Sequence, residues 1–138
     1  AQCKASEHSF LSDSYTVRSL IEQRGDVHHV FPKDYLAKKG CKKSEYNQVA
    51  NYVYTEQPVN LKLSNAAPNV YMKTIQQDIT SEKNEITSLK TKEDLNGNLA
   101  LHCIPSNIEQ LDASSYNDFL VARRKLMAHK IKMFYMAL

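Results

Sequence analysis

Two adjacent histidines, His28 and His29, lie in the short apolar segment "GDVHHVFP" (residues 25–32). Consecutive residues of a strand point to opposite faces, so one ring could be buried and the other solvated. If the strand ends there, both rings could instead serve one site. A neutral imidazole can accept a proton from water, and imidazole is also a common metal ligand. Hydrolysis of a phosphodiester needs both functions, because the attacking water must lose a proton and the leaving oxygen must be neutralised.

Two asparagines follow the histidines at suggestive intervals. Asn51 opens the next segment of strand-forming residues, and Asn60 lies nine residues later, near the start of a short helical segment. Taken singly, each asparagine is typical of a turn or a helix cap. Asn47 could take the place of Asn51 beside the histidines, but we favour a structural role for Asn47. The order strand, excursion, strand and helix predicts a ββα unit.

These side chains must be positioned by short elements. Strand-forming residues near 26–31 and 52–56 predict one small hairpin. Because an isolated hairpin is only marginally stable in water, helices must pack on it. The fold class expected is therefore α+β and mostly helical. Helices are predicted over residues 12–24 (capped by Ser12 or Asp13), 33–40 (ending at Gly40), 44–51, 58–63, 67–79 (beginning at Pro68) and 114–138.

The second half of the chain carries two further signals. In the polar stretch 80–98, "TKED" resembles a capping box, and Asn96–Gly97 predicts a turn. The C-terminal helix is amphipathic, and its Arg123–Arg124–Lys125 cluster is interpreted as a solvated face or as a DNA contact. Its predicted apolar face comprises Phe119, Leu126, Ile131 and Phe134, and the predicted polar side comprises Arg123, Arg124, Lys125 and Lys130.

Length and composition are those of one small globular domain, residues 1–138. The net charge of +3 leans only mildly towards anionic partners, so charge alone does not predict nucleic-acid binding. Cys3, Cys41 and Cys103 are odd in number and have no Cys-x-x-Cys spacing, which favours a reducing cytoplasm over secretion. No membrane span or signal peptide is predicted, and the initial alanine suggests a piece of a longer chain.

The motif residues resemble a known family. "DVHHVFPKDYL…NQVANYVYTEQPVNLKLSNAAP" resembles the HNH nuclease fold, specifically the HNH domain at the C-terminus of GmrSD-type modification-dependent restriction enzymes. The resemblance covers residues 12–72, and "FLVARRKLMAHKIKMF" fits that family's closing helix. It implies a ββα-metal core, made of a hairpin and a helix, surrounded by helices, with residues 73–138 as a helical C-terminal part.

The resemblance also implies a role for each motif residue. His29 would be the general base that activates water, and His28 and Asn60 would hold one divalent metal ion. Asn51 would accept a hydrogen bond from the N–H of His29 through its side-chain oxygen, leaving the other ring nitrogen free to take a proton from water. Strand periodicity, rather than the resemblance, adds Asp26: two residues before His28 it would share that face, where it could orient the ring or bind the ion through water.

Two lysines flank the motif. Lys33 and Lys62 could hold phosphates, although surface lysines are more often only solvated. Few protein ligands leave room for water around the ion, which favours Mg²⁺ or Mn²⁺ while still admitting Ni²⁺, Co²⁺ or Zn²⁺.

The function expected is a metal-dependent DNA endonuclease domain of a bacterial restriction or defence enzyme in the cytoplasm. The resemblance implies double-stranded DNA as substrate and an N-terminal nucleotide-hydrolysing domain that selects it. Two alternatives remain: a non-catalytic nucleic-acid- or protein-binding module that keeps the ββα shape, and a nuclease that acts on RNA.

Overall fold

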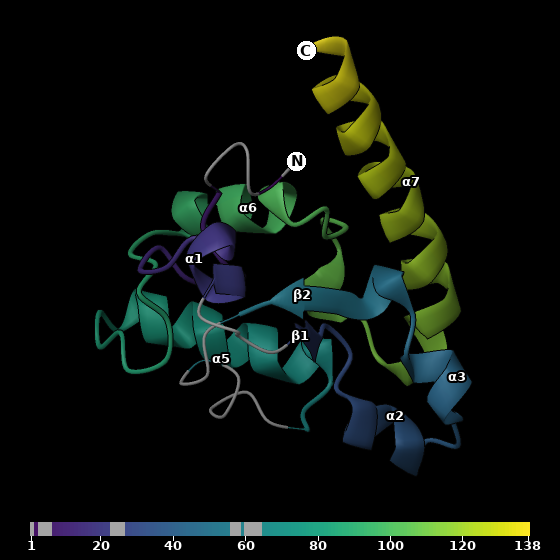
Figure 1. Ribbon diagram of the computed structural model, residues 1–138. Coiled ribbons are helices and arrows are strands. Elements are labelled where there is room, and N and C mark those ends of the chain that lie inside the picture. The colour runs from purple at the N-terminus through teal and green to yellow at the C-terminus, as the bar shows by residue number, and fades with distance from the viewer. Residues whose placement is uncertain (1, 3–6, 23–26, 56–58, 60–64) are drawn as a thin grey trace.

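The computed structural model describes residues 2, 7–22, 27–55, 59 and 65–138 of the chain (Figure 1). Asp26, Asn60 and Lys62 lie outside these residues. The fold is α+β and mostly helical, with one small antiparallel sheet, as predicted. None of the helices in the described ranges has the length and apolarity needed to cross a membrane.

The sheet is the predicted hairpin, shortened to its centre. Strand β1 (Val27–His29) pairs with β2 (Tyr52–Tyr54), with His28 opposite Val53 and His29 opposite Tyr52. Two short helices, α2 (Lys33–Lys38) and α3 (Lys43–Tyr46), and the 3₁₀ turn η1 (Val49–Asn51) connect the two strands. Gly40 lies just after α2 and has a φ of +93°, a conformation that glycine adopts without strain.

The exit of β1 is held deep in the core. Val30 and Phe31 are fully buried, and the Phe31 ring packs edge-on against Phe119, 4.9 Å away between centroids. The Tyr71 hydroxyl donates a hydrogen bond of 2.7 Å to the carbonyl of Val30, and burial raises the pKa of that hydroxyl. The hairpin is therefore anchored at one end to α5 (Pro68–Thr80) and to α7 (Tyr116–Met136).

The first helix is shorter than predicted. α1 spans Val17–Glu22, and Ser12 and Asp13 do not cap it. Ser12 is instead buried, where its hydroxyl accepts a hydrogen bond from Ser14 N and contacts Ser88 Oγ. Thr16 caps the helix instead, because its hydroxyl accepts a hydrogen bond from Ser19 N at 3.1 Å. The cap therefore lies three or four residues after the predicted one, and Ser12 makes tertiary contacts instead.

A helix replaces the turn predicted at Asn96–Gly97. α6 spans Lys92–Leu101, and the Thr91 side chain caps it by accepting a hydrogen bond from Asp94 N, as the capping-box signal predicted. The buried Asn98 holds this helix to the N-terminal segment through hydrogen bonds to Leu11 N, Ser9 O and Ser12 O. These contacts stabilise the helix through Asn96 and Gly97 despite their weak helix propensity.

The C-terminal helix α7 forms as predicted, but its buried face differs. Phe119 is buried, whereas Leu126 and Ile131 are 42% and 50% exposed, because the distal part of α7 projects beyond the rest of the protein (Figure 1). Arg123, predicted to be solvated, is only 4% exposed. It lies four residues after Phe119, and a helix repeats every 3.6 residues, so both face the core.

The Arg123 guanidinium joins three segments of the core. It donates hydrogen bonds to the carbonyls of Ala50 and Tyr52, at 2.9 and 2.7 Å, and to that of His102 at 3.1 and 3.2 Å. Burial lowers the pKa of this group to about 10, which still leaves it charged at neutral pH. Arg123 therefore cannot serve as the DNA contact considered for this cluster.

The remaining short elements close the core around α5. η2 (Ile108–Gln110) packs on α5, and η3 (Ala113–Ser115) leads directly into α7. The Tyr35 hydroxyl accepts a hydrogen bond from Ala113 N at 2.8 Å, which ties α2 to this turn. The contact between Tyr35 and Ala113 therefore fixes α2, which lies between the two strands in sequence, to the helical part of the fold.

Candidate catalytic site on the hairpin

The two histidine rings project from opposite faces of the hairpin. His28 shares its face with Val53, which is buried in the core, and His29 shares the other face with Tyr52. Both histidines are partly buried. The strand does not end between them, so their adjacency in sequence does not bring the two rings to one side.

The His29 ring is held by a carboxamide and two aromatic rings. Its Nε2 lies 2.9 Å from Asn47 Oδ1. The rings of Tyr52 and Tyr46 meet it edge-on, with centroids 5.2 and 6.1 Å away. A carboxamide oxygen only accepts hydrogen bonds, so the neutral imidazole carries its proton on Nε2. Its other nitrogen, Nδ1, then has the lone pair that a general base requires.

Asn51 does not contact His29, which corrects the role predicted for it. This side chain is fully buried. Its Oδ1 accepts a hydrogen bond from Phe31 N at 2.8 Å, and its Nδ2 donates to Phe31 O and Tyr46 O at 3.0 and 3.1 Å. Asn51 thus joins the exit of β1 to the end of α3, where Asn47 follows. It positions the partner of His29 rather than His29 itself.

The sequence favoured Asn51 over Asn47 as the hydrogen-bond partner of His29, but the carboxamide at hydrogen-bond distance from the ring belongs to Asn47. The two residues lie four positions apart, both in the segment that connects the two strands. Which one meets the ring depends on the non-helical backbone of Asn47, with φ −88° and ψ 70°, at the end of α3. No periodic pattern in the sequence predicts that local geometry.

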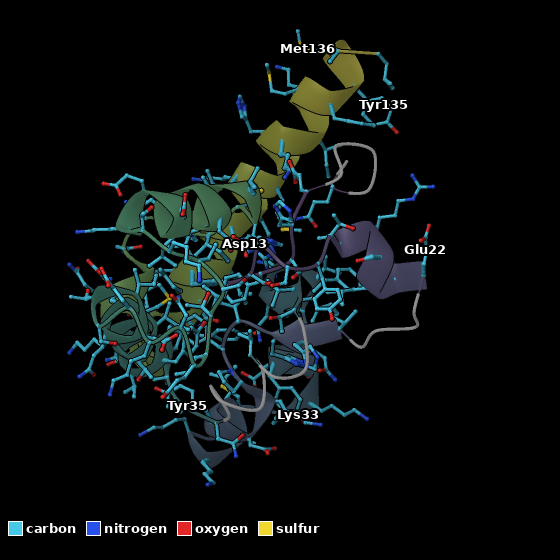
Figure 2. All side chains as sticks on the ribbon, turned by 90° about the vertical axis from the view of Figure 1, so that its left-hand side faces the viewer. Asp13, Glu22, Lys33, Tyr35, Tyr135 and Met136 are labelled. Carbon is cyan, nitrogen blue, oxygen red and sulfur yellow. The ribbon has the colours of Figure 1, made fainter. Side chains whose placement is uncertain are left out.

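The other predicted site residues are only partly described. Lys33, the first residue of α2, is exposed and lies at the end of the protein opposite Tyr135 and Met136 (Figure 2). Val59, which immediately precedes Asn60, is fully buried in the core. Within the described ranges, no cluster of three or more His, Cys, Asp or Glu could hold a metal ion.

The expected metal ligands are a histidine and an asparagine, so a cluster of that kind is not required. On that expectation, His28 would supply an imidazole nitrogen from β1, and Asn60 would supply a carboxamide oxygen. Such a set leaves most coordination positions to water and phosphate oxygens, which fits a hydrated divalent ion.

Comparison with known proteins gives little direct information on function. No family model and no solved structure matches the chain. The uncharacterized protein MJ0686 of Methanocaldococcus jannaschii is 27% identical over 130 residues, which cover 86% of this chain and 22% of that protein. The chain therefore spans about a fifth of the length of the relative that it matches.

Proposed function

We propose that this chain is a metal-dependent DNA endonuclease domain of the HNH type, with a ββα core. The observation that supports it is the hydrogen bond between His29 Nε2 and Asn47 Oδ1. This contact leaves Nδ1 of a partly exposed imidazole as a proton acceptor on the hairpin surface. A histidine held in one tautomer by a neighbour is typical of a general base.

In the proposed reaction, His29 Nδ1 takes a proton from a water molecule as the water oxygen attacks the phosphorus atom. The bond between phosphorus and the leaving 3′ oxygen then breaks. Asn47 Oδ1 accepts the Nε2–H throughout, and this favours the imidazolium that forms. The edges of Tyr46 and Tyr52 restrict rotation of the ring. His28 and Asn60 would hold a divalent ion whose charge neutralises the leaving oxygen. Because His28 and His29 project from opposite faces of β1, the phosphate would have to lie at the edge of the strand, between the two rings.

The wider setting is also part of the proposal. An N-terminal nucleotide-hydrolysing portion of a longer protein would select modified, double-stranded DNA, in the cytoplasm of a bacterium that uses the enzyme for defence. Asp26 would orient His28 or bind the ion through water. Lys33 and Lys62 would contact phosphates beside the cleaved bond.

Plasmid nicking tests this proposal directly. The 138-residue chain is expected to convert supercoiled plasmid to the nicked form in Mg²⁺ or Mn²⁺, and excess chelator is expected to abolish the conversion. Gel electrophoresis measures the rate. Nicking that persists in chelator would contradict a metal-dependent mechanism, and a chain that binds plasmid without cutting it would be the non-catalytic module instead.

Replacing Asn47 with alanine is expected to slow nicking by about 10- to 100-fold, the usual effect of losing a partner that orients a functional histidine. Asn47→Asp should recover part of the rate. It should also move the acidic limb of the pH–rate profile to higher pH, because a carboxylate stabilises the imidazolium more than a carboxamide does. Initial nicking rates across a pH series measure both effects.

A merely structural role for Asn47 predicts a different result. Neither variant would then change the pH profile, and the loss of rate would follow the loss of folded protein. Gln48→Ala is the matched control, since Gln48 is adjacent, and its side chain bonds only to Ser44 O and Arg124 among the described residues. We expect Gln48→Ala to keep both the rate and the pH profile.

A further inference from the structure

The net positive charge of the chain is concentrated in residues 33–45, here called the lysine segment. It contains two carboxylates, Asp34 and Glu45, and the rest of the chain carries thirteen basic and thirteen acidic residues. The whole net charge of +3 thus arises from thirteen consecutive residues. The basic residues of the segment are Lys33, Lys38, Lys39, Lys42 and Lys43.

The lysine segment is fixed to the core by its other side chains. Leu36 is fully buried, and the Tyr116 hydroxyl donates a hydrogen bond of 2.7 Å to Glu45 O. Tyr35 bonds to Ala113, and Asn51 bonds to Tyr46 just beyond the segment. The backbone that carries the lysines is therefore held from beneath, so the spacing between the charges is set by the fold.

The lysines themselves are exposed and form no ion pair with any carboxylate in the described residues. Lys39 Nζ lies 6.0 Å from the Tyr35 ring centroid, a contact that leaves its charge available. Asp112, the nearby acid, accepts hydrogen bonds from the backbone N–H and hydroxyl of Ser114. The charge of Lys39 also acts on the Asp112 carboxylate, so the positive charge of the segment is only partly balanced within the described protein.

Helix-end electrostatics explain only part of this arrangement. Lys38 and Lys39 lie at the C-terminal end of α2, where cations are favourable. Lys42 and Lys43 lie at the N-terminal end of α3, where cations are unfavourable. Helix-end electrostatics therefore do not account for the second pair.

We infer that the lysine segment binds the phosphate backbone of duplex DNA beside the hairpin. The segment begins four residues after His29 and ends next to Tyr46 and Asn47, which both contact the His29 ring. DNA held on these lysines would run past that ring. This inference depends on the proposed nuclease function for its purpose, but DNA binding by the segment can be measured without cleavage.

The test compares two sets of substitutions in His29→Ala protein with chelator present, so that no DNA is cut. One set is K38Q/K39Q/K42Q/K43Q. The matched control is K73Q/K83Q/K92Q/K132Q, which removes the same charge from exposed lysines elsewhere. Fluorescence anisotropy of a short fluorescein-labelled duplex gives Kd across a series of KCl concentrations.

We expect the slope of log Kd against log salt to fall by about 0.9 for each lysine that had neutralised a phosphate, so by roughly 1 to 4 in the first set. The control should keep the parent slope. Equal slopes in both sets, or binding to phosphatidylserine vesicles but not to the duplex, would overturn the inference. Both sets are compared by urea unfolding, so that loss of folding is recognised.

The two proposals fail in different ways. Duplex binding that depends on the lysine segment, with no cleavage in Mg²⁺ by protein that retains His29, would remove the nuclease function and leave this inference standing. Metal-dependent nicking by the parent protein, with unchanged salt dependence of DNA binding in the first set, would remove this inference and leave the nuclease function standing.

Discussion

Replacing His29 with alanine is expected to slow plasmid nicking by about 10²- to 10⁴-fold, the usual contribution of a positioned general base. The substitution removes the imidazole whose Nε2 is held by Asn47, and with it the proposed proton acceptor. Initial rates in Mg²⁺, at equal protein concentration, measure the loss. Added imidazole should restore part of the rate, because it can enter the space left by the ring.

His129→Ala is the matched control, since His129 is exposed on α7 and lies outside the proposed site. It should nick plasmid at the parent rate. Chemical denaturation of both variants separates chemistry from folding, because loss of the edge-on contacts with Tyr46 and Tyr52 should cost about 1–3 kcal/mol. Undiminished nicking by His29→Ala would show that another group activates the water.

Replacing Asn51 with alanine is expected to lower the free energy of unfolding by about 3–5 kcal/mol. The side chain is fully buried and makes three hydrogen bonds to the backbone of Phe31 and Tyr46. Alanine would leave one N–H and two carbonyls without these partners, and each orphaned buried group costs about 1–3 kcal/mol. The loss is a large part of the 5–15 kcal/mol that stabilises a typical domain.

Urea unfolding followed by circular dichroism measures this effect. Asn117→Ala is the control, because Asn117 is exposed in the first turn of α7, and it should change the unfolding free energy by less than about 0.5 kcal/mol. Asn47→Ala should also be much milder than Asn51→Ala in stability while impairing nicking. If Asn51→Ala unfolds like the parent but does not nick, Asn51 acts in catalysis and the structural role assigned above is wrong.

The contrast between Asn47 and Asn51 separates two kinds of polar residue near one site. The buried residue is saturated by backbone groups and stabilises the loop that presents the partly exposed one. The side chain of the partly exposed residue, Asn47, makes its one hydrogen bond among the described residues to His29. Substitutions at these two positions should therefore divide cleanly between stability and activity.

Elements whose signals are local could be predicted from the amino-acid sequence. The hairpin, the helix that begins at Pro68, the Thr91 cap and the long C-terminal helix all follow from residue type and spacing. Such signals act over a few residues, so the rest of the fold hardly alters them. They also sufficed to place the chain in the α+β class.

Tertiary structure alone decided which polar residues are buried and what they contact. Arg123 lies inside because the carbonyls of Ala50, Tyr52 and His102 surround it, and Asn51 is held by Phe31 and Tyr46. These partners come from segments distant in sequence, and the cost of an unpaired buried polar group makes each such choice all-or-none. The hydrogen-bond partner of His29 also depends on tertiary structure, because the end of α3 places the Asn47 carboxamide beside the ring.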